Sequence, residues 1–143
     1  MLENFIIIDA NFILLPFQFK IDYLYEIDAK LEGKTIFIVY KQILDELEAK
    51  TIREPEARKF HMNFKAGLLY LEKNNEKYNI DYKQNIKLKD DTTDNFLLKS
   101  CMELKNVSKR VFLATNDAEL RRKANKMEVS TIFLRQKKYL SFD

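Results

Sequence analysis

Four acidic residues stand at points of this sequence where an acid can do chemistry. Asp9 ends an apolar run rich in isoleucine, and Asp117 follows another apolar run far along the chain. A buried strand has no structural need for a charge at its carboxyl end, which is where ligands bind in open α/β sheets. Glu46 falls early in an expected helix, and Asp94 falls in the first turn of a later one. If the fold brings these acids together, they form one acidic site.

Such a site would have a definite chemistry. Carboxylates packed together repel one another and lose hydration, and a hard divalent cation relieves both costs. Mg²⁺ and Mn²⁺ prefer oxygen ligands and keep bound water, whose pKa the metal lowers while it neutralises charge on a phosphate. Phosphodiester hydrolysis by this route needs neither histidine nor cysteine, and the chain has one of each, His61 and Cys101.

Each acid also has an ordinary structural interpretation. Asp9 and Asp117 are suited to cap the helices that follow them. Asp94 is suited to the positive end of a helix dipole, and Glu46 to a solvated helix face. Spacing alone leaves these alternatives open, and the shared position at element junctions is what favours a common site.

The elements that must position the acids alternate between short apolar strands and helices. Strands are expected at residues 5–8, 35–40, 78–82, 111–115 and 130–134. Helical segments are expected at 11–15, stopped by Pro16; at 21–31, ended by Gly33; around 43–47; from Pro55 to about 71; from Thr92 or Thr93 to 104; and at 117–127. This order predicts an α/β class fold, a single-domain α/β/α sandwich over residues 1–143 with a central, mainly parallel sheet.

Apolar side chains outside these strands suggest how the rest of the chain packs. The stripe Phe60, Phe64, Leu68 and Leu71 is expected in the core, with dimerisation as the alternative. Near the end of the sequence, aromatic side chains either dock the last segment onto the core or stack on bases.

Composition excludes several classes of protein. The 143 residues are 46% hydrophobic and 33% charged, as in ordinary globular domains. No apolar run approaches the roughly 20 residues that cross a membrane, and no secretory signal is recognisable. The lone cysteine excludes an intramolecular disulfide and favours the cytoplasm. Two glycines are too few for a glycine-rich phosphate loop.

Four segments together resemble the motifs of the PIN-domain family of metal-dependent nucleases. They are residues 6–13, 43–48, 93–97 and 114–122. The last is the most specific, because it reads Thr-Asn-Asp followed by a basic helix. With the strand at 132–135, it looks most like the archaeal and eukaryotic branch related to small-subunit rRNA-processing nucleases, and less like the compact toxins of toxin–antitoxin pairs.

The resemblance implies an endoribonuclease that hydrolyses single-stranded RNA with Mg²⁺ or Mn²⁺, in rRNA or other RNA processing. It implies that Asp9, Asp94 and Asp117 hold metal directly or through water, and that Glu46 holds or orients metal-bound water. Supporting groups that aim the acids would be Asn11, Thr115 and Asn116, for which turn and cap chemistry is the alternative.

The third motif departs from the family pattern. Asn95 stands where relatives often carry a second acid. An amide hydrogen-bonds water but supplies no charge, so this motif offers less to a second metal ion. Glu119 either compensates or only favours the helix dipole.

Basic residues gather in the last third of the chain. Residues 105–143 carry a net charge of +6, and the rest carry −3. The side chains expected to contact RNA phosphates are Arg121, Arg122, Lys123 and Lys126, with Arg135, Lys137 and Lys138 after the last expected strand. The alternative is a solvated helix face.

Other functions remain open at this level. One is a non-catalytic RNA-binding scaffold, for example in ribosome assembly, which Asn95 favours. Another is a toxin held by an antitoxin partner. The resemblance also implies frequent homodimers. A response-regulator-like phosphate-handling domain is disfavoured, because no lysine is suitably placed after a strand and glycine turns are lacking.

Overall fold

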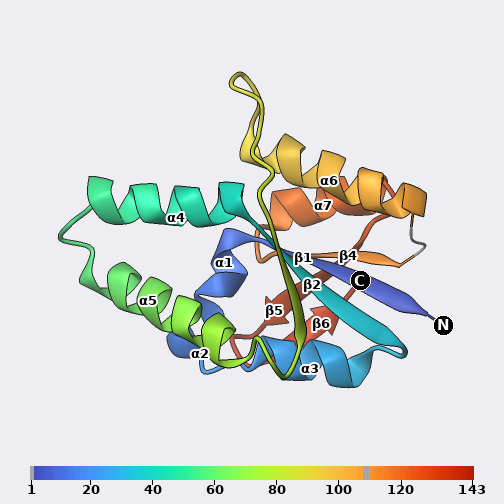
Figure 1. Ribbon diagram of the computed structural model, residues 1–143, viewed down its shortest axis with the longest axis horizontal. Helices are drawn as coiled ribbons and strands as arrows, with labels where there is room; N and C mark the ends of the chain where they lie inside the picture. Colours follow the sequence, from blue (N-terminus) through green and yellow to red (C-terminus); the bar gives the residue numbers. More distant parts are fainter. Residues whose placement is uncertain (1, 108–109) are drawn as a thin grey trace.

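A six-stranded sheet forms the centre of the molecule (Figure 1). The computed structural model describes residues 2–107 and 110–143, without the side chains of residues 106 and 107. The strand order is β3-β2-β1-β4-β5-β6. The strands are β1 (Glu3–Ile8), β2 (Lys34–Tyr40), β3 (Asn79–Lys83), β4 (Val111–Ala114), β5 (Ser130–Arg135) and β6 (Tyr139–Phe142).

The first strand lies in the middle because it is apolar on both faces. Ile6, Ile7 and Ile8 are fully buried, as expected for a parallel strand covered on both sides by helices. β1 pairs in parallel with β2 and with β4, and Ile8 is in register with Ala114. Since β3 and β5 are also parallel to their neighbours, five strands end at the same edge of the sheet. Any acid placed after these strands therefore lies along one edge.

Helices cover the sheet and form a hairpin beside it. They are α1 (Ala10–Ile13), α2 (Leu15–Gln18), α3 (Tyr23–Lys30), α4 (Lys41–Arg53), α5 (Arg58–Lys73), α6 (Thr93–Val107) and α7 (Ala118–Lys126). In Figure 1, α6 and α7 lie above the strands and α3 lies below them, while α4 and α5 project to the left. α6 contacts β1 and β4, α7 contacts β5, and α5 contacts α1, α2 and α4.

One glycine allows the helical hairpin to approach the acid-bearing edge. A Cβ atom on Gly67 of α5 would collide with the carbonyl oxygen of Ile13 in α1. The missing side chain therefore lets α5 pack directly on the short helix that follows Asp9. In residues 2–107 and 110–143, the longest helices are too short or too polar to cross a membrane.

The predicted fold class is confirmed: the molecule is an α/β protein with a mainly parallel sheet flanked by helices. All five expected strands form, within one or two residues of their expected bounds.

Several local predictions are wrong, and each has a physical reason. Pro16 does not stop a helical turn but lies at the start of α2, where a missing N–H is harmless. α3 ends at Lys30, before Gly33, whose φ of 90° is used in the turn into β2. Residues 55–56 form a turn, and the next helix begins at Arg58. Leu68 is 37% exposed, because Gly67 faces α1 in its place.

The last strand is the main addition to the expected topology. β6 runs antiparallel to β5, and the partly buried Phe142 packs against the core, whereas the side chain of Tyr139 is exposed. The turn before it uses positive φ angles of 53° and 57° at Gln136 and Lys137. Such a turn is usually signalled by Asn-Gly, which this sequence lacks there.

Candidate active site

Asp9 lies at the carboxyl end of the central strand and is held on both of its oxygens. Its backbone N–H donates to the carbonyl of Ala114, which extends the pairing of β1 with β4 by one residue. Oδ1 accepts from the Ala10 N–H at 2.7 Å and caps α1. Oδ2 accepts from the Thr115 hydroxyl at 2.7 Å and from the Asn11 amide at 3.3 Å. The Asp9 residue is 9% exposed, and its capping bond leaves Oδ2 to the Thr115 and Asn11 side chains.

Asn11, Thr115 and Asn116 form the frame around this acid. The Asn11 amide also donates to Thr115 Oγ1 at 3.3 Å, and Asn11 Oδ1 accepts from the Asn116 N–H at 3.0 Å. Asn116 Oδ1 accepts from the Leu134 N–H at 2.8 Å, which ties the frame to β5. Three strands are thereby joined at one point of the sheet edge. Asn11 and Thr115 thus contact Asp9 directly, and Asn116 contacts Asn11; that these residues aim the acid for chemistry stays a prediction.

Asp117 begins α7 directly beside this frame. Its N–H donates to Thr115 Oγ1 at 3.1 Å, and its Oδ1 accepts from the N–H groups of Glu119 and Leu120. Both of the capping bonds fall on Oδ1. The helix-cap alternative is therefore correct as local structure, and the exposed carboxylate remains next to Thr115, the partner of Asp9.

Asp9, Asp94 and Asp117 influence one another electrostatically. Burial raises the pKa of Asp9 above its usual range, and the charges of Asp94 and Asp117 raise it further. The pKa of Asp94 is also raised, first by burial and then by the charge of Asp117. Lys123 opposes this shift, whereas Glu119 and Glu46 add to it. Carboxyl groups from β1, α6 and α7 thus share one region of unfavourable negative potential.

Glu46 reaches the same region from α4 and is held by two residues. Its Oε2 accepts from the Gln42 amide at 2.7 Å and from the Thr93 hydroxyl at 2.6 Å. Thr93 is the first residue of α6 and precedes Asp94, so this bond ties α4 to the start of α6. The alternative of a freely solvated helix face does not describe Glu46, which is partly buried.

Gln42 and Thr93 are the members of this arrangement that the sequence did not predict. Gln42 precedes Glu46 by four residues on one helix, and that spacing is a known signal for side-chain hydrogen bonds. Thr93 is 47 residues from Glu46 in sequence, and only the packing of α6 near α4 brings them together.

Asn95 lies away from these acids. It is exposed, and its N–H donates to Thr92 Oγ1. The pKa of Asp91 is lowered first by the hydrogen bond from Lys99, with smaller contributions from the Thr92 N–H and the Asn95 side chain. The predicted supporting role of Asn95 remains a prediction.

Basic residues line a separate hollow on α7. The guanidinium carbon of Arg121 lies 3.8 Å from the centre of the Phe133 ring. Its Nε is buried, with no hydrogen-bond partner among the described residues. A cavity of about 430 Å³ is lined by Ala118, Arg121, Arg122, Asn125 and Lys126. Lys138 is exposed in the turn that follows β5.

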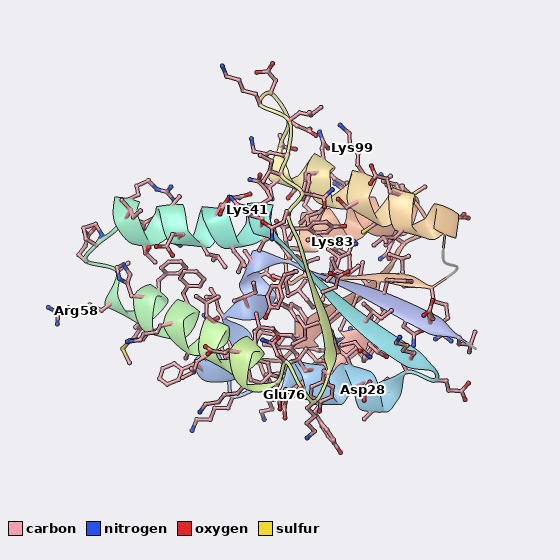
Figure 2. All side chains as sticks on the ribbon, viewed as in Figure 1. Asp28, Lys41, Arg58, Glu76, Lys83 and Lys99 are labelled. Carbon is pink, nitrogen blue, oxygen red and sulfur yellow. The ribbon has the colours of Figure 1, made fainter. Side chains whose placement is uncertain are left out.

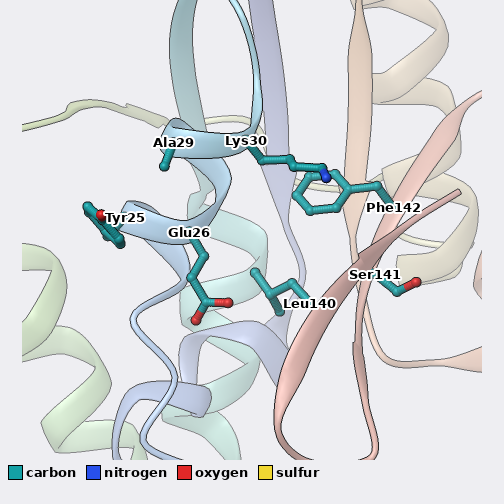
Figure 3. Close-up of a pocket in the computed structure, with 7 residues that line it drawn as sticks. All are labelled: Tyr25, Glu26, Ala29, Lys30, Leu140, Ser141 and Phe142. Carbon is teal, nitrogen blue, oxygen red and sulfur yellow. The ribbon is translucent and has the colours of Figure 1, made fainter.

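Another cavity, of about 490 Å³, lies between α3 and β6 (Figure 3). None of the four predicted acids is among its lining residues, Tyr25, Glu26, Ala29, Lys30, Leu140, Ser141 and Phe142. Burial, followed by the charge of Asp22, raises the pKa of Glu26 there. The cavity offers one carboxylate where the strand edge offers several, so the acid-bearing edge is the better candidate for metal-assisted chemistry.

The acids approach one another without forming a closed metal cage. Within residues 2–107 and 110–143, no group of three or more His, Cys, Asp or Glu side chains stands close enough to hold an ion directly. All of the donors are carboxylates flanked by amides and hydroxyls, a set suited to a hydrated Mg²⁺ or Mn²⁺. The residues therefore fit a metal that keeps water between itself and some of its protein partners.

One curated relative matches nearly the whole chain. It is Ribonuclease VapC4 of Methanocaldococcus jannaschii, which is 29% identical over 134 residues, covering 94% of this chain and 92% of the relative.

Two solved structures share the fold. The PIN domain endonuclease Utp24 superposes with a TM-score of 0.68 at 21% identity, over 97% of this chain and 90% of the other. A domain of a functionally unknown protein from Methanocaldococcus jannaschii superposes with a TM-score of 0.63 at 16% identity, over 92% of this chain and 91% of the other. A model of the PIN domain matches residues 6–135, from β1 to the end of β5. The chain belongs to the PIN-domain family.

Proposed function

We propose that this protein is a metal-dependent endoribonuclease that hydrolyses single-stranded RNA, in RNA processing. The observation that carries the proposal is the electrostatic coupling of Asp9, Asp94 and Asp117, three carboxyl groups brought to one edge from distant parts of the chain. Beyond the effect of burial, the charges of Asp94 and Asp117 raise the pKa of Asp9, and the charge of Asp117 raises the pKa of Asp94. Carboxyl groups shifted in this way are common at functional sites.

Mg²⁺ or Mn²⁺ is the proposed cofactor, held by Asp9, Asp94 and Asp117, with Glu46 as a further metal-facing acid. When bound, the ion would activate water and neutralise charge on the phosphodiester. The chain's own residues supply orientation. Asn11 and Thr115 fix Oδ2 of Asp9, and Thr93 fixes Oε2 of Glu46, so the carboxylates are aimed before any ligand arrives.

RNA is the proposed substrate because a relative with 29% identity is named a ribonuclease. The positive surface on α7 and in the turn after β5 supports a polyanionic ligand, and the proposed phosphate contacts are Arg121, Arg122, Lys126 and Lys138. Arg121 is the best prepared of these, since Phe133 holds its guanidinium group by cation–π contact.

The direct test is cleavage of end-labelled single-stranded RNA by the full chain. We expect internal cleavage with Mn²⁺ or Mg²⁺, none in EDTA, and weaker cleavage of duplex RNA of the same sequence. If neither metal supports cleavage while the RNA still binds, the catalytic proposal fails and an RNA-binding scaffold is the better interpretation.

The proposed phosphate contact of Arg121 makes a separate prediction about salt. Removing one contact to single-stranded RNA lowers the slope of log K against log salt by about 0.7. We therefore expect Arg121→Ala to weaken RNA binding and to reduce this slope by that amount, as measured by fluorescence anisotropy in EDTA. Lys34→Ala is the control, because exposed Lys34 begins β2 at the opposite edge of the sheet. Equal slopes for the two variants would contradict the assignment of Arg121.

A further inference from the structure

One buried side chain, Gln42, connects Glu46 to an exposed loop. Gln42 is 9% exposed and lies in the first turn of α4. Its Nε2 donates to Glu46 Oε2 at 2.7 Å, and its Oε1 accepts from the Lys87 N–H at 3.0 Å. Its own N–H donates to the carbonyl of Asn85 at 3.4 Å. Both ends of the amide are therefore used, one toward the acid site and one toward the loop.

The loop spans residues 84–92 and projects past the edge of the sheet that carries the acids. It joins β3 to α6 and rises at the top of the molecule (Figure 1). At its far end, Lys99 holds Asp91 at 3.0 Å, and Asp91 Oδ1 accepts from the Thr92 N–H. The labelled Lys41, Lys83 and Lys99 lie around the base of the loop in Figure 2. The loop is thus anchored beside Glu46 at one end and beside the helix bearing Asp94 at the other.

The outer part of the loop has the chemistry of a contact surface for a single nucleic-acid strand. Ile86 and Leu88 are 59% and 74% exposed. Lys89 is exposed between Leu88 and the loop's acidic end, and Lys87 alternates with the aliphatic pair. Aliphatic groups contact bases, and lysines contact phosphates. This combination favours RNA over a protein partner, because the loop borders the acidic site where the strand would be cut.

We infer that Gln42 is a positioning residue that couples this loop to Glu46, so that the hydrogen-bonded loop keeps the Glu46 carboxylate in place while the outer part of the loop contacts an RNA strand. The part of this inference that concerns RNA rests on the proposed ribonuclease function, whereas the coupling of the loop to Glu46 does not. The amide group of Gln42 is planar and rigid, so movement of the Lys87 backbone at Oε1 is transmitted to Nε2 and to the carboxylate it holds. Glu46 would then be correctly placed only when the loop is in its hydrogen-bonded position.

Two substitutions at one loop position separate the backbone contact from the charge. Lys87→Ala removes the ammonium group but keeps the N–H that Gln42 accepts, whereas Lys87→Pro removes both. We expect both variants to raise the KM for single-stranded RNA by a similar two- to fivefold factor. We expect only Lys87→Pro to lower kcat, by about fivefold to tenfold, the effect of losing one hydrogen bond. Equal kcat values for two folded variants would overturn the inference. An unchanged KM in both would overturn RNA contact by the loop and favour a protein ligand for it.

A second measurement needs neither RNA nor metal and survives failure of the proposed function. In NMR spectra of the full chain, Lys87→Pro should shift the side-chain amide protons of Gln42 and the γ-methylene signals of Glu46, and Lys87→Ala should leave them in place. Gln42→Met, which keeps length but removes both hydrogen bonds, should speed exchange of the Lys87 N–H at least tenfold. If the Glu46 signals do not respond to Lys87→Pro, the coupling is absent, whatever the chain does to RNA. If they respond while the wild-type chain fails to cut RNA, the coupling stands and the ribonuclease proposal fails.

Discussion

Replacing Asp9 by asparagine is expected to reduce metal-dependent cleavage of single-stranded RNA on the order of 1000-fold, the scale of losing one preorganised electrostatic group. Asp9 is the most buried of the four acids and contributes its charge from the central strand. Asparagine keeps the size of the side chain and can still accept one hydrogen bond, but it cannot balance a cation. Single-turnover rates with saturating Mn²⁺ measure the effect. Asp117→Asn should cause a comparable loss, and activity that survives both changes together would refute the assignment.

The same substitution has a signature in stability that does not depend on RNA. The pKa of Asp9 is raised in the folded state, so the folded chain binds a proton more tightly than the unfolded chain. Stability from this group is therefore present at low pH and lost as pH rises from its ordinary value through the raised one. We expect Asp9→Asn to flatten the fall in unfolding free energy over the pH range that begins at the ordinary aspartate pKa of about 4 and ends above the raised one. Urea denaturation across this range checks the slope, and an unchanged slope would show that Asp9 is not destabilised in the fold.

Asn11→Ala is expected to reduce cleavage by about 10- to 100-fold without removing any charge, as is usual for groups that orient metal-binding acids. The change deletes the donor to Asp9 Oδ2 and the acceptor for the Asn116 N–H. Because a partly buried N–H is left without its partner, the free energy of unfolding should also fall by about 1–3 kcal/mol.

A second asparagine serves as the control that separates the orienting role of Asn11 from the general effect of shortening an asparagine side chain to alanine. Asn79→Ala changes an exposed residue at the start of β3, and we expect it to alter stability by less than about 0.5 kcal/mol and to leave cleavage intact. Cleavage rates and urea midpoints for the two variants should therefore diverge. An Asn11→Ala protein that cuts RNA at the normal rate would show that Asp9 needs no orienting amide.

The core strands could be predicted because their local and tertiary preferences agree. Residues 5–8 and 35–40 are apolar on both faces, which is what a central parallel strand requires. β6 could not be predicted, since it is short and only half-buried, and since Gln136 and Lys137 adopt positive φ angles without a glycine or asparagine to signal them. The hydrogen-bonded pairing of β6 with β5 offsets the unfavourable positive φ angles of Gln136 and Lys137.

The acids of the candidate site could be predicted for a similar reason: Asp9 and Asp117 follow strands, and parallel strands end together. The hydrogen bonds that hold Glu46 could be predicted only in part. Gln42 is a local neighbour on the same helix, whereas Thr93 approaches through packing between α4 and α6 that leaves no periodic trace in the sequence. The same holds for the cation–π contact of Arg121 with Phe133.

The frame around Asp9 also sets an order of events during protein synthesis. Asp9 is made early, but Thr115 follows it by 106 residues, and Asn116 is held by the N–H of Leu134. A ribosome makes the chain from its amino end, so all four acids are present once residue 117 has been added, but the hydrogen bonds around Asp9 stay incomplete until Leu134 follows. A nascent chain that ends before Leu134 therefore holds every acid of the candidate site without the full set of hydrogen bonds that fixes Asp9.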